Sequence, residues 1–206
     1  PLVTILVGVG LSKLIAPAIG TAASSVGEFV EWATVLQPFW MGILVSVVIG
    51  IALTLPISSA AICAALGLTG LAGGAAVAGC CAQMVGFAVM SFRENRWGGL
   101  VAQGVGTSML QMPNIVKNPR IWIPPILASA ILAPVSTVVF KMTNSPVGSG
   151  MGTSGLVGQF SAYANMISEG KHAGWVILQI LLMHFVLPAL VTFGIAQGMR
   201  KAKWIN

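Results

Sequence analysis

Residues 144–158 read NSPVGSGMGTSGLVG, and five of these fifteen residues are glycine. Long apolar runs flank the stretch, with ILASAILAPVSTVVF before it and WVILQILLMHFVLPALV after it. Because repeated glycine disfavours a continuous helix, the stretch interrupts a chain that is otherwise apolar and helical in pattern. Irregular backbone at membrane depth is tolerated only where it is buried in protein or lines a water-filled cavity. The interruption is therefore the part of the sequence that points most directly to a function.

The composition is that of a membrane protein. Apolar residues make up 56% of the 206 residues, charged residues only 7%, and the mean hydropathy is +0.93, whereas soluble domains have roughly 25% charged residues. The apolar runs are continuous rather than alternating, which indicates helices and not a β-barrel. The predicted fold class is an all-α polytopic membrane protein. The basic residues stand singly or in short groups between apolar runs, so the net charge of +6 reflects membrane topology, and no nucleic-acid partner is expected.

Six apolar segments approach or exceed the roughly 20 residues that span a bilayer. They cover residues 2–22, 36–55, 58–92, 97–113, 120–141 and 173–199. The third is too long for one straight span and contains GLTGLAGG at 67–74, which predicts a broken helix. We interpret residues 1–206 as a single transmembrane domain. Because the chain begins at Pro1 without Met, we expect it to be the later part of a longer protein.

Charge predicts the orientation of these six spans. On this topology Lys117 and Arg120 share a side with the C-terminal residues 200–203, giving that side a net charge of +5, while the loops on the other side sum to zero. Because Lys and Arg concentrate on the cytoplasmic side, we expect the C-terminus in the cytoplasm and Glu28 and Glu31 outside. If 67–74 instead turns the third segment back on itself, every later segment changes side.

Two interpretations of the glycine-rich stretch are open. It is an extramembrane loop after Lys141, or a re-entrant hairpin that enters through residues 146–152 and returns along 153–167. The second is favoured, because TSGLVGQFSAYANMI at 153–167 predicts a short apolar helix, with Thr153 or Ser154 as N-cap, that cannot span a bilayer. Such a helix would aim its free N–H groups at the interior, which suits an anionic or hydroxyl-rich ligand. The predicted binding residues of this stretch are Asn144, Ser145, Gly150, Gly152, Thr153 and Ser154.

A second interruption lies at residues 54–59, which read TLPISS. A pair of Gly- or Pro-interrupted apolar segments is the best sequence pointer to a transporter's binding site. Ser58 and Ser59 are therefore added to the predicted binding residues, and we expect residues 56–59 to share a polar cavity with the N-terminus of the 153–167 helix. Residues 150–155 match GxGxxG, but no βαβ unit surrounds them, so no dinucleotide cofactor is predicted.

Two ionisable residues lie inside apolar segments, Lys13 in the first and His184 in the last. Such residues are costly in lipid and are functional candidates by default. Snorkelling of Lys13 and a neutral His184 hydrogen-bonded between helices are the alternatives. Gln111, Asn114 and Gln179 are interpreted as interhelical hydrogen-bonding residues. The chain has no Asp, its four Glu lie in predicted loops, and its three Cys lack CxxC spacing; these features predict no catalysis, no metal and no cofactor.

The run NSPVGSGMGTSGLVGQ, with PISSAAI and the six-segment pattern, resembles the EIIC-like membrane proteins of the phosphotransferase system, in particular the perfringolysin-O-regulator-like branch. The resemblance implies a small sugar- or polyol-type solute, a homodimer, re-entrant hairpins around a central site, a multi-pass location in the bacterial plasma membrane, and separate IIA and IIB proteins as partners. The Gly-Ile-Thr-Glu motif of better-known sugar EIIC proteins is missing here, and Glu169 lies in a predicted loop.

The leading hypothesis is therefore a membrane carrier that moves a small polar solute by alternating access. The rival is a membrane sensor that binds such a solute without transporting it. A purely structural subunit would leave the glycine-rich interruption, Lys13 and His184 unexplained. The sequence does not separate the carrier from the sensor.

Overall fold

The computed structural model describes the backbone of residues 2–205 and the side chains of residue 9 and residues 20–205. The helices, with π and 3-10 turns marked η, are α1 (Leu2–Leu36), α2 (Pro38–Thr54), α3 (Ser59–Leu66), α4 (Gly70–Met90), α5 (Phe92–Val101), η1 (Ala102–Gly106), η2 (Ser108–Gln111), α6 (Met112–Lys117), η3 (Pro119–Trp122), α7 (Ile123–Pro134), η4 (Val135–Val139), α8 (Pro146–Ser149), η5 (Ser154–Leu156), α9 (Val157–Ser168), α10 (Ala173–Leu181), η6 (Leu182–Val186) and α11 (Leu187–Lys201). The described residues form no strand, so the predicted all-α class is confirmed.

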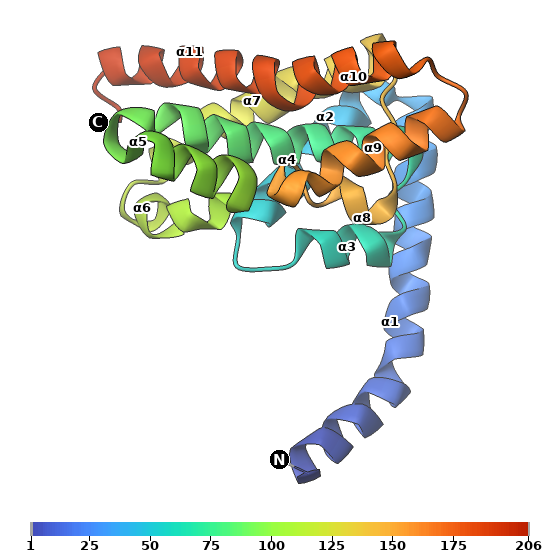
Figure 1. The fold of residues 1–206 in the computed structure, drawn as a ribbon. Coiled ribbons are helices and arrows are strands. Elements are labelled where there is room, and N and C mark those ends of the chain that lie inside the picture. The colour runs from blue at the N-terminus through green and yellow to red at the C-terminus, as the bar shows by residue number, and fades with distance from the viewer. Residues whose placement is uncertain (1, 206) are drawn as a thin grey trace.

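Three continuous helical stretches in the described residues are long and apolar enough to cross a membrane, Gly70–Met90, Pro119–Val139 and Ala173–Lys201, and α2 is a shorter apolar helix. Helix α4 lies at the centre, and α2, α7 and α11 pack against it (Figure 1). Small residues make this close packing possible. A Cβ added at Gly79, for example, would collide with the Ser46 carbonyl of α2.

The chain breaks inside 58–92, as predicted. Helix α3 ends at Gly67, whose φ is +65°, and α4 begins at Gly70. Helices α2 and α4 run in the same direction, because Ser46 packs on Gly79 and Thr54 bonds to Gln83. Residues 55–69 must therefore return the chain to the end of the bundle where α2 began.

The six-span topology is wrong at 97–113. Arg200 Nη2 lies 2.7 Å from Glu94 Oε1 and donates to the Met90 carbonyl, so residues 92–96 lie beside the C-terminal helix and not on the far side from it. Ile115 of α6 belongs to the same apolar cluster as Met90 and Met199. Residues 92–117, here called the basic-end hairpin, thus enter along α5, turn near Thr107 and come back along α6. The α-helical part of the inward arm is only ten residues long, too short to cross.

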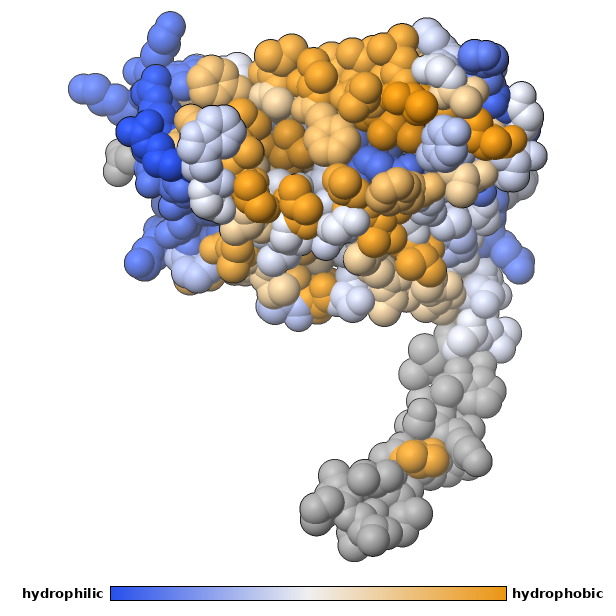
Figure 2. Space-filling model, in the orientation of Figure 1, coloured by the Kyte–Doolittle hydropathy of each residue, from blue (hydrophilic) through white to orange (hydrophobic). Residues whose placement is uncertain are grey.

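Charge separates sharply between the two ends of the bundle. Figure 2 shows hydrophilic side chains gathered at both ends, with a broad apolar surface between them. One end, here called the basic end, carries Arg93, Glu94, Arg96, Lys117, Arg120, Arg200, Lys201 and Lys203. The other, here called the opposite end, carries Glu28, Glu31, Lys141, Glu169 and Lys171. Seven Lys and Arg side chains therefore lie at the basic end and two at the opposite end. The six-span topology predicts a weaker bias, with five Lys and Arg on one side of the membrane and four on the other.

Candidate functional site

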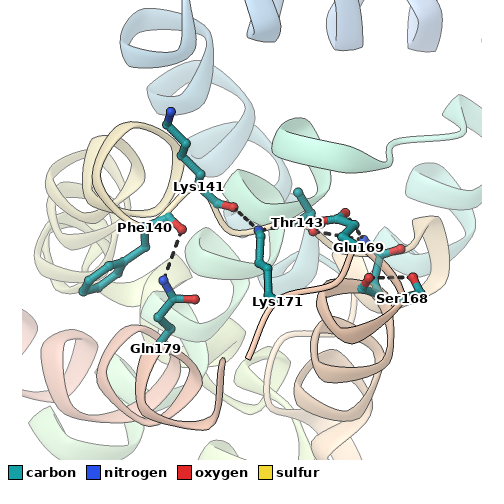
Figure 3. Close-up of polar contacts among 8 residues, drawn as sticks. Phe140, Lys141, Thr143, Ser168, Glu169, Lys171 and Gln179 are labelled. Carbon is teal, nitrogen blue, oxygen red and sulfur yellow. Dashed lines mark hydrogen bonds and ion pairs between the residues drawn. The ribbon is translucent and has the colours of Figure 1, made fainter. Parts of the chain in front are cut away.

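Residues 142–170, here called the opposite-end hairpin, also begin and end at one end of the bundle. At its mouth the Thr143 hydroxyl donates to Glu169 Oε1 at 2.6 Å, and Lys171 Nζ donates to the Lys141 carbonyl at 2.7 Å (Figure 3). Lys171 also pairs with the Glu169 carboxylate at 3.3 Å. These contacts hold the entering and returning arms together. The entering arm of the opposite-end hairpin consists of α8 and irregular backbone, and the returning arm is α9.

Asn144 and Ser145 join the two arms. Asn144 is fully buried, donates from Nδ2 to the Gly158 carbonyl at 3.2 Å, and accepts from the Ser145 amide at 2.9 Å. The Ser145 and Ser161 hydroxyls lie 2.6 Å apart. These side chains are engaged within the hairpin, which fixes the separation of its arms.

The two interruptions of the sequence meet in space. The Ser59 hydroxyl donates to the Gly150 carbonyl at 2.7 Å, and α3 packs against α8. Ser58 caps α3, because its hydroxyl accepts from the Ala61 amide at 3.2 Å. The two interruptions are therefore in direct contact, through α3 and α8.

The expected helix start at Thr153 or Ser154 is wrong. A single 3-10 turn covers Ser154–Leu156, and α9 begins at Val157 without a side-chain cap. The physical reason is backbone conformation, since Gly155 and Leu156 are both left-handed, with φ of +53° and +59°. The Thr153 hydroxyl points instead to Met84 Sδ of α4, at 3.5 Å. The stretch is not wholly non-helical either, because α8 forms one turn at its start.

The expected polar cavity shared by residues 56–59 and the helix N-terminus stays a prediction. Thr153 is fully buried against α4. Cavities of about 330 to 460 Å³ occur in the described part of the chain, and neither Thr153 nor residues 56–59 line them. Gly150 and Gly152 lie against backbone of α3 and α4, so the glycines serve close packing in this conformation.

The tips of the two hairpins touch partway along the bundle, where Val105 of η1 and Gly155 of η5 are exposed. The basic-end hairpin reaches its tip at η1, the opposite-end hairpin at η5, and η1 packs against η5. In many carriers, discontinuous helices that meet near the bilayer midplane form the binding site. This contact is the geometric centre of the candidate site.

A buried polar pair lies next to these tips. Gln159 Nε2 and His184 Nδ1 are 3.0 Å apart, and Gln159 Nε2 also lies 3.4 Å from Cys81 Sγ. His184 is fully buried on the π-turn η6, a kind of bulge often found at functional sites. Gln159 Oε1 and His184 Nε2 have no hydrogen-bond partner among the described residues. The pair therefore holds unused hydrogen-bonding capacity beside the hairpin tips.

His184 was predicted from its depth in an apolar segment, whereas Gln159 was missed. The available signal for Gln159 was its position, directly after the last glycine of the quoted stretch, where the returning arm starts. Gln179 and Gln111 bond between separate elements, as predicted, since Gln179 Nε2 donates to the Phe140 carbonyl at 3.2 Å and Gln111 Nε2 donates to Gln103 Oε1 at 2.8 Å. Asn114 instead makes a local bond, to Gln111 three residues earlier, at 2.9 Å. Lys13 belongs to α1, but its side chain lies outside the described residues.

Comparison with known proteins gives a family assignment. The family model described as "Phosphotransferase system, EIIC" matches residues 1–206. No match was found among curated proteins or among solved structures. EIIC proteins are the membrane-embedded permease components of the phosphotransferase system, which agrees with the long apolar helices and with the resemblance drawn from the sequence; the match does not distinguish branches. Because the family model matches all 206 residues, the chain belongs to the EIIC family of the phosphotransferase system.

Proposed function

We propose that the chain is a carrier of the EIIC type that binds a small sugar- or polyol-class solute between the tips of its two hairpins and moves it by alternating access. The observation that carries the proposal is the contact of η1 with η5. Each tip belongs to a hairpin that is anchored at a different end of the bundle. Rearrangement of one hairpin would open the tip region to one end while the other hairpin keeps it closed.

The charge bias supports an orientation. Seven Lys and Arg side chains lie at the basic end and two at the opposite end. By the positive-inside rule the basic end faces the cytoplasm. The basic-end hairpin then enters from the cytoplasm and the opposite-end hairpin from outside, in a multi-pass protein of the bacterial plasma membrane.

Gln159 and His184 are the proposed solute contacts. A hydroxyl group both donates and accepts hydrogen bonds, so a polyhydroxylated solute suits a pair that offers one free amide oxygen and one free ring nitrogen. Gly150, Gly152, Thr153 and Ser154 shape the backbone of the tip, while Asn144, Ser145, Ser58 and Ser59 hold the hairpin and α3 in place. Lys13 remains a further candidate contact.

A second copy of the chain is the proposed cover for the exposed link between α2 and α3. Pro56, Ile57 and Ser58 are exposed, and Ile57 keeps half of its surface accessible. Irregular backbone does not face lipid, so a homodimer would bury this link. Separate IIA and IIB proteins are the further partners that membership of the family suggests.

The test is uptake into proteoliposomes made from the purified chain, with a panel of labelled hexoses, hexitols and amino sugars. We expect saturable uptake of at least one solute. His184→Leu and Gln159→Leu should each weaken its binding about 3- to 10-fold, the size of one lost hydrogen bond at 0.5–1.5 kcal/mol. Leu190→Val, on the exposed face of α11, serves as the control and should leave uptake unchanged. Solute-dependent thermal stabilisation without any uptake would contradict the carrier and favour the sensor.

A further inference from the structure

A mixed cavity opens beside the basic-end hairpin. Its volume is about 380 Å³, and Phe87, Glu94, Gln111, Asn114 and Arg200 are among the residues that line it. At its mouth the Glu94 carboxylate and the Arg200 guanidinium bond at 2.7 Å, so their charges compensate each other. The cavity thus offers a mainly apolar wall with several polar groups and little net charge to a solute that arrives from the basic end.

A ladder of amide side chains continues from this cavity into the hairpin. Asn114 Nδ2 donates to Gln111 Oε1 at 2.9 Å, and Gln111 Nε2 donates to Gln103 Oε1 at 2.8 Å. Gln103 Nε2 in turn donates to the Ser91 hydroxyl at 3.1 Å. Gln103 and Gln111 are both buried. The interior of the hairpin is therefore lined by neutral groups that can donate and accept hydrogen bonds.

Gln83 lies one helical turn deeper than Phe87 on the same face of α4. Its Oε1 accepts from Trp122 Nε1 at 3.0 Å and from the Thr54 hydroxyl at 3.3 Å. Thr54 also lies 2.9 Å from the Ser108 hydroxyl, where the basic-end hairpin turns. Four separate elements, α2, η2, α4 and η3, converge on this polar cluster. It is distinct from the Gln159–His184 pair.

The cluster has one unused donor. Gln83 is fully buried, and its Nε2 has no hydrogen-bond partner in the part of the chain that the structure describes. The indole of Trp122 can only donate, which fixes Oε1 toward Trp122 and leaves the NH₂ group as the unpaired end. A buried donor without a partner costs about 1–3 kcal/mol. A solute oxygen would satisfy it.

We propose that Gln83, Thr54 and Ser108 form a second binding position for a neutral polyhydroxylated solute. The three side chains are fully buried and lie beyond the 380 Å³ cavity, whose lining includes Phe87 of the same face of α4. A solute from the basic end would therefore enter by way of this cavity when the basic-end hairpin moves. Gln83 Nε2 donates to a solute oxygen. The Thr54 proton is donated to Gln83 Oε1 and the Ser108 proton to Thr54, so the two hydroxyl oxygens accept from a neighbouring solute hydroxyl. This position lies between the basic end and the hairpin tips. The inference rests on the proposed carrier function and adds a second binding position on the cytoplasmic side of the solute's route.

The first test measures access by thiol labelling. In a chain with Cys63, Cys80 and Cys81 replaced by Ala, Ser108→Cys is exposed to a membrane-impermeant methanethiosulfonate from the basic-end side. Ser129→Cys is the matched control, because Ser129 is equally buried but bonds to the Pro125 carbonyl within α7. We expect Ser108→Cys to react at least about tenfold faster than the control and to be slowed by saturating sorbitol or glucose. Equal rates, or no slowing by either solute, would overturn the proposal.

The second test uses the chain with its native cysteines and measures the half-saturation concentration for uptake. Gln83→Leu should raise it about tenfold. Thr192→Val removes another buried hydroxyl that has no partner in the described structure and should leave it within twofold. If Gln83→Leu behaves like the unsubstituted chain while His184→Leu weakens uptake, the second position is wrong and the carrier stands. If the unsubstituted chain takes up no solute at all, the carrier proposal fails and this inference fails with it.

Discussion

Gly152 and Gly155 share a left-handed backbone but differ in their surroundings. Their φ values are +54° and +53°. A Cβ at Gly152 would lie 2.8 Å from Cys80 Cβ and 3.0 Å from the Cys80 carbonyl carbon, whereas the nearest atom at Gly155 is 3.8 Å away, in Val157. Only the first glycine therefore combines backbone strain with a close approach to α4.

This difference predicts unequal effects of one substitution. Gly155→Ala should lower stability by about 1–2 kcal/mol, the cost of a side chain in left-handed backbone. Gly152→Ala should add a further 1–3 kcal/mol, because it overpacks the contact with Cys80. The apparent Tm of each purified variant, measured at one scan rate in one detergent, checks this. Equal losses of Tm in the two variants would contradict this prediction, because they would show that the close approach of Gly152 to Cys80 does not affect stability.

At the residue scale, the sequence predicts which residues matter better than it predicts the directions in which their side chains point. His184 was identifiable because a titratable side chain inside an apolar segment is costly wherever it points. Ser58 was identifiable as a cap because the helix start follows it directly. Thr153 failed as a cap, since its hydroxyl direction depends on two left-handed residues further along and on Met84 of a distant helix.

At the scale of elements, the contact between α3 and the opposite-end hairpin ties the two helix interruptions together. It includes a buried hydrogen bond from the Ser59 hydroxyl to the Gly150 carbonyl, and the Ser149 hydroxyl donates to the Leu68 carbonyl just after α3. The partners in both bonds come from segments that cannot form long helices, so none of them is held firmly by its own secondary structure. Long-range contacts such as this one must supply the order.

Ser59→Ala should therefore destabilise the fold by about 1–3 kcal/mol, since it leaves a buried carbonyl without its partner. Ser25→Ala is the control, because the Ser25 hydroxyl bonds only to the Thr21 carbonyl on the exposed face of α1 and Ala is the better helix former. Hydrogen exchange of residues 146–152 should rise in Ser59→Ala and stay unchanged in Ser25→Ala. Unchanged exchange in both would show that the two interruptions are ordered independently.

The elements also show where sequence patterns mislead. The interruption at 67–74 was predictable, because glycine clusters there. The segment 97–113 looked like a span, because length and apolarity cannot distinguish one crossing helix from two short arms that turn back. The distinguishing contact joins Glu94 to Arg200, more than a hundred residues later, and no local pattern encodes it.

At the scale of the whole molecule, the defining feature is a pair of hairpins. The basic-end hairpin and the opposite-end hairpin enter the bundle from different ends and meet at their tips. On this arrangement the loops at residues 91–96 and 200–203 share one face of the membrane, and residues 169–172 lie on the other. The six-span topology instead separates residues 93–96 from the C-terminus.

Sided cysteine labelling in vesicles of known orientation decides between the two. Asn95→Cys, Lys201→Cys and His172→Cys, all at exposed positions, are placed one at a time in a chain whose native Cys are replaced by Ala, and are treated with an impermeant thiol reagent. We predict that Asn95→Cys and Lys201→Cys react from the cytoplasmic side and His172→Cys only from the outside. Labelling of Asn95→Cys from the same side as His172→Cys would contradict this arrangement.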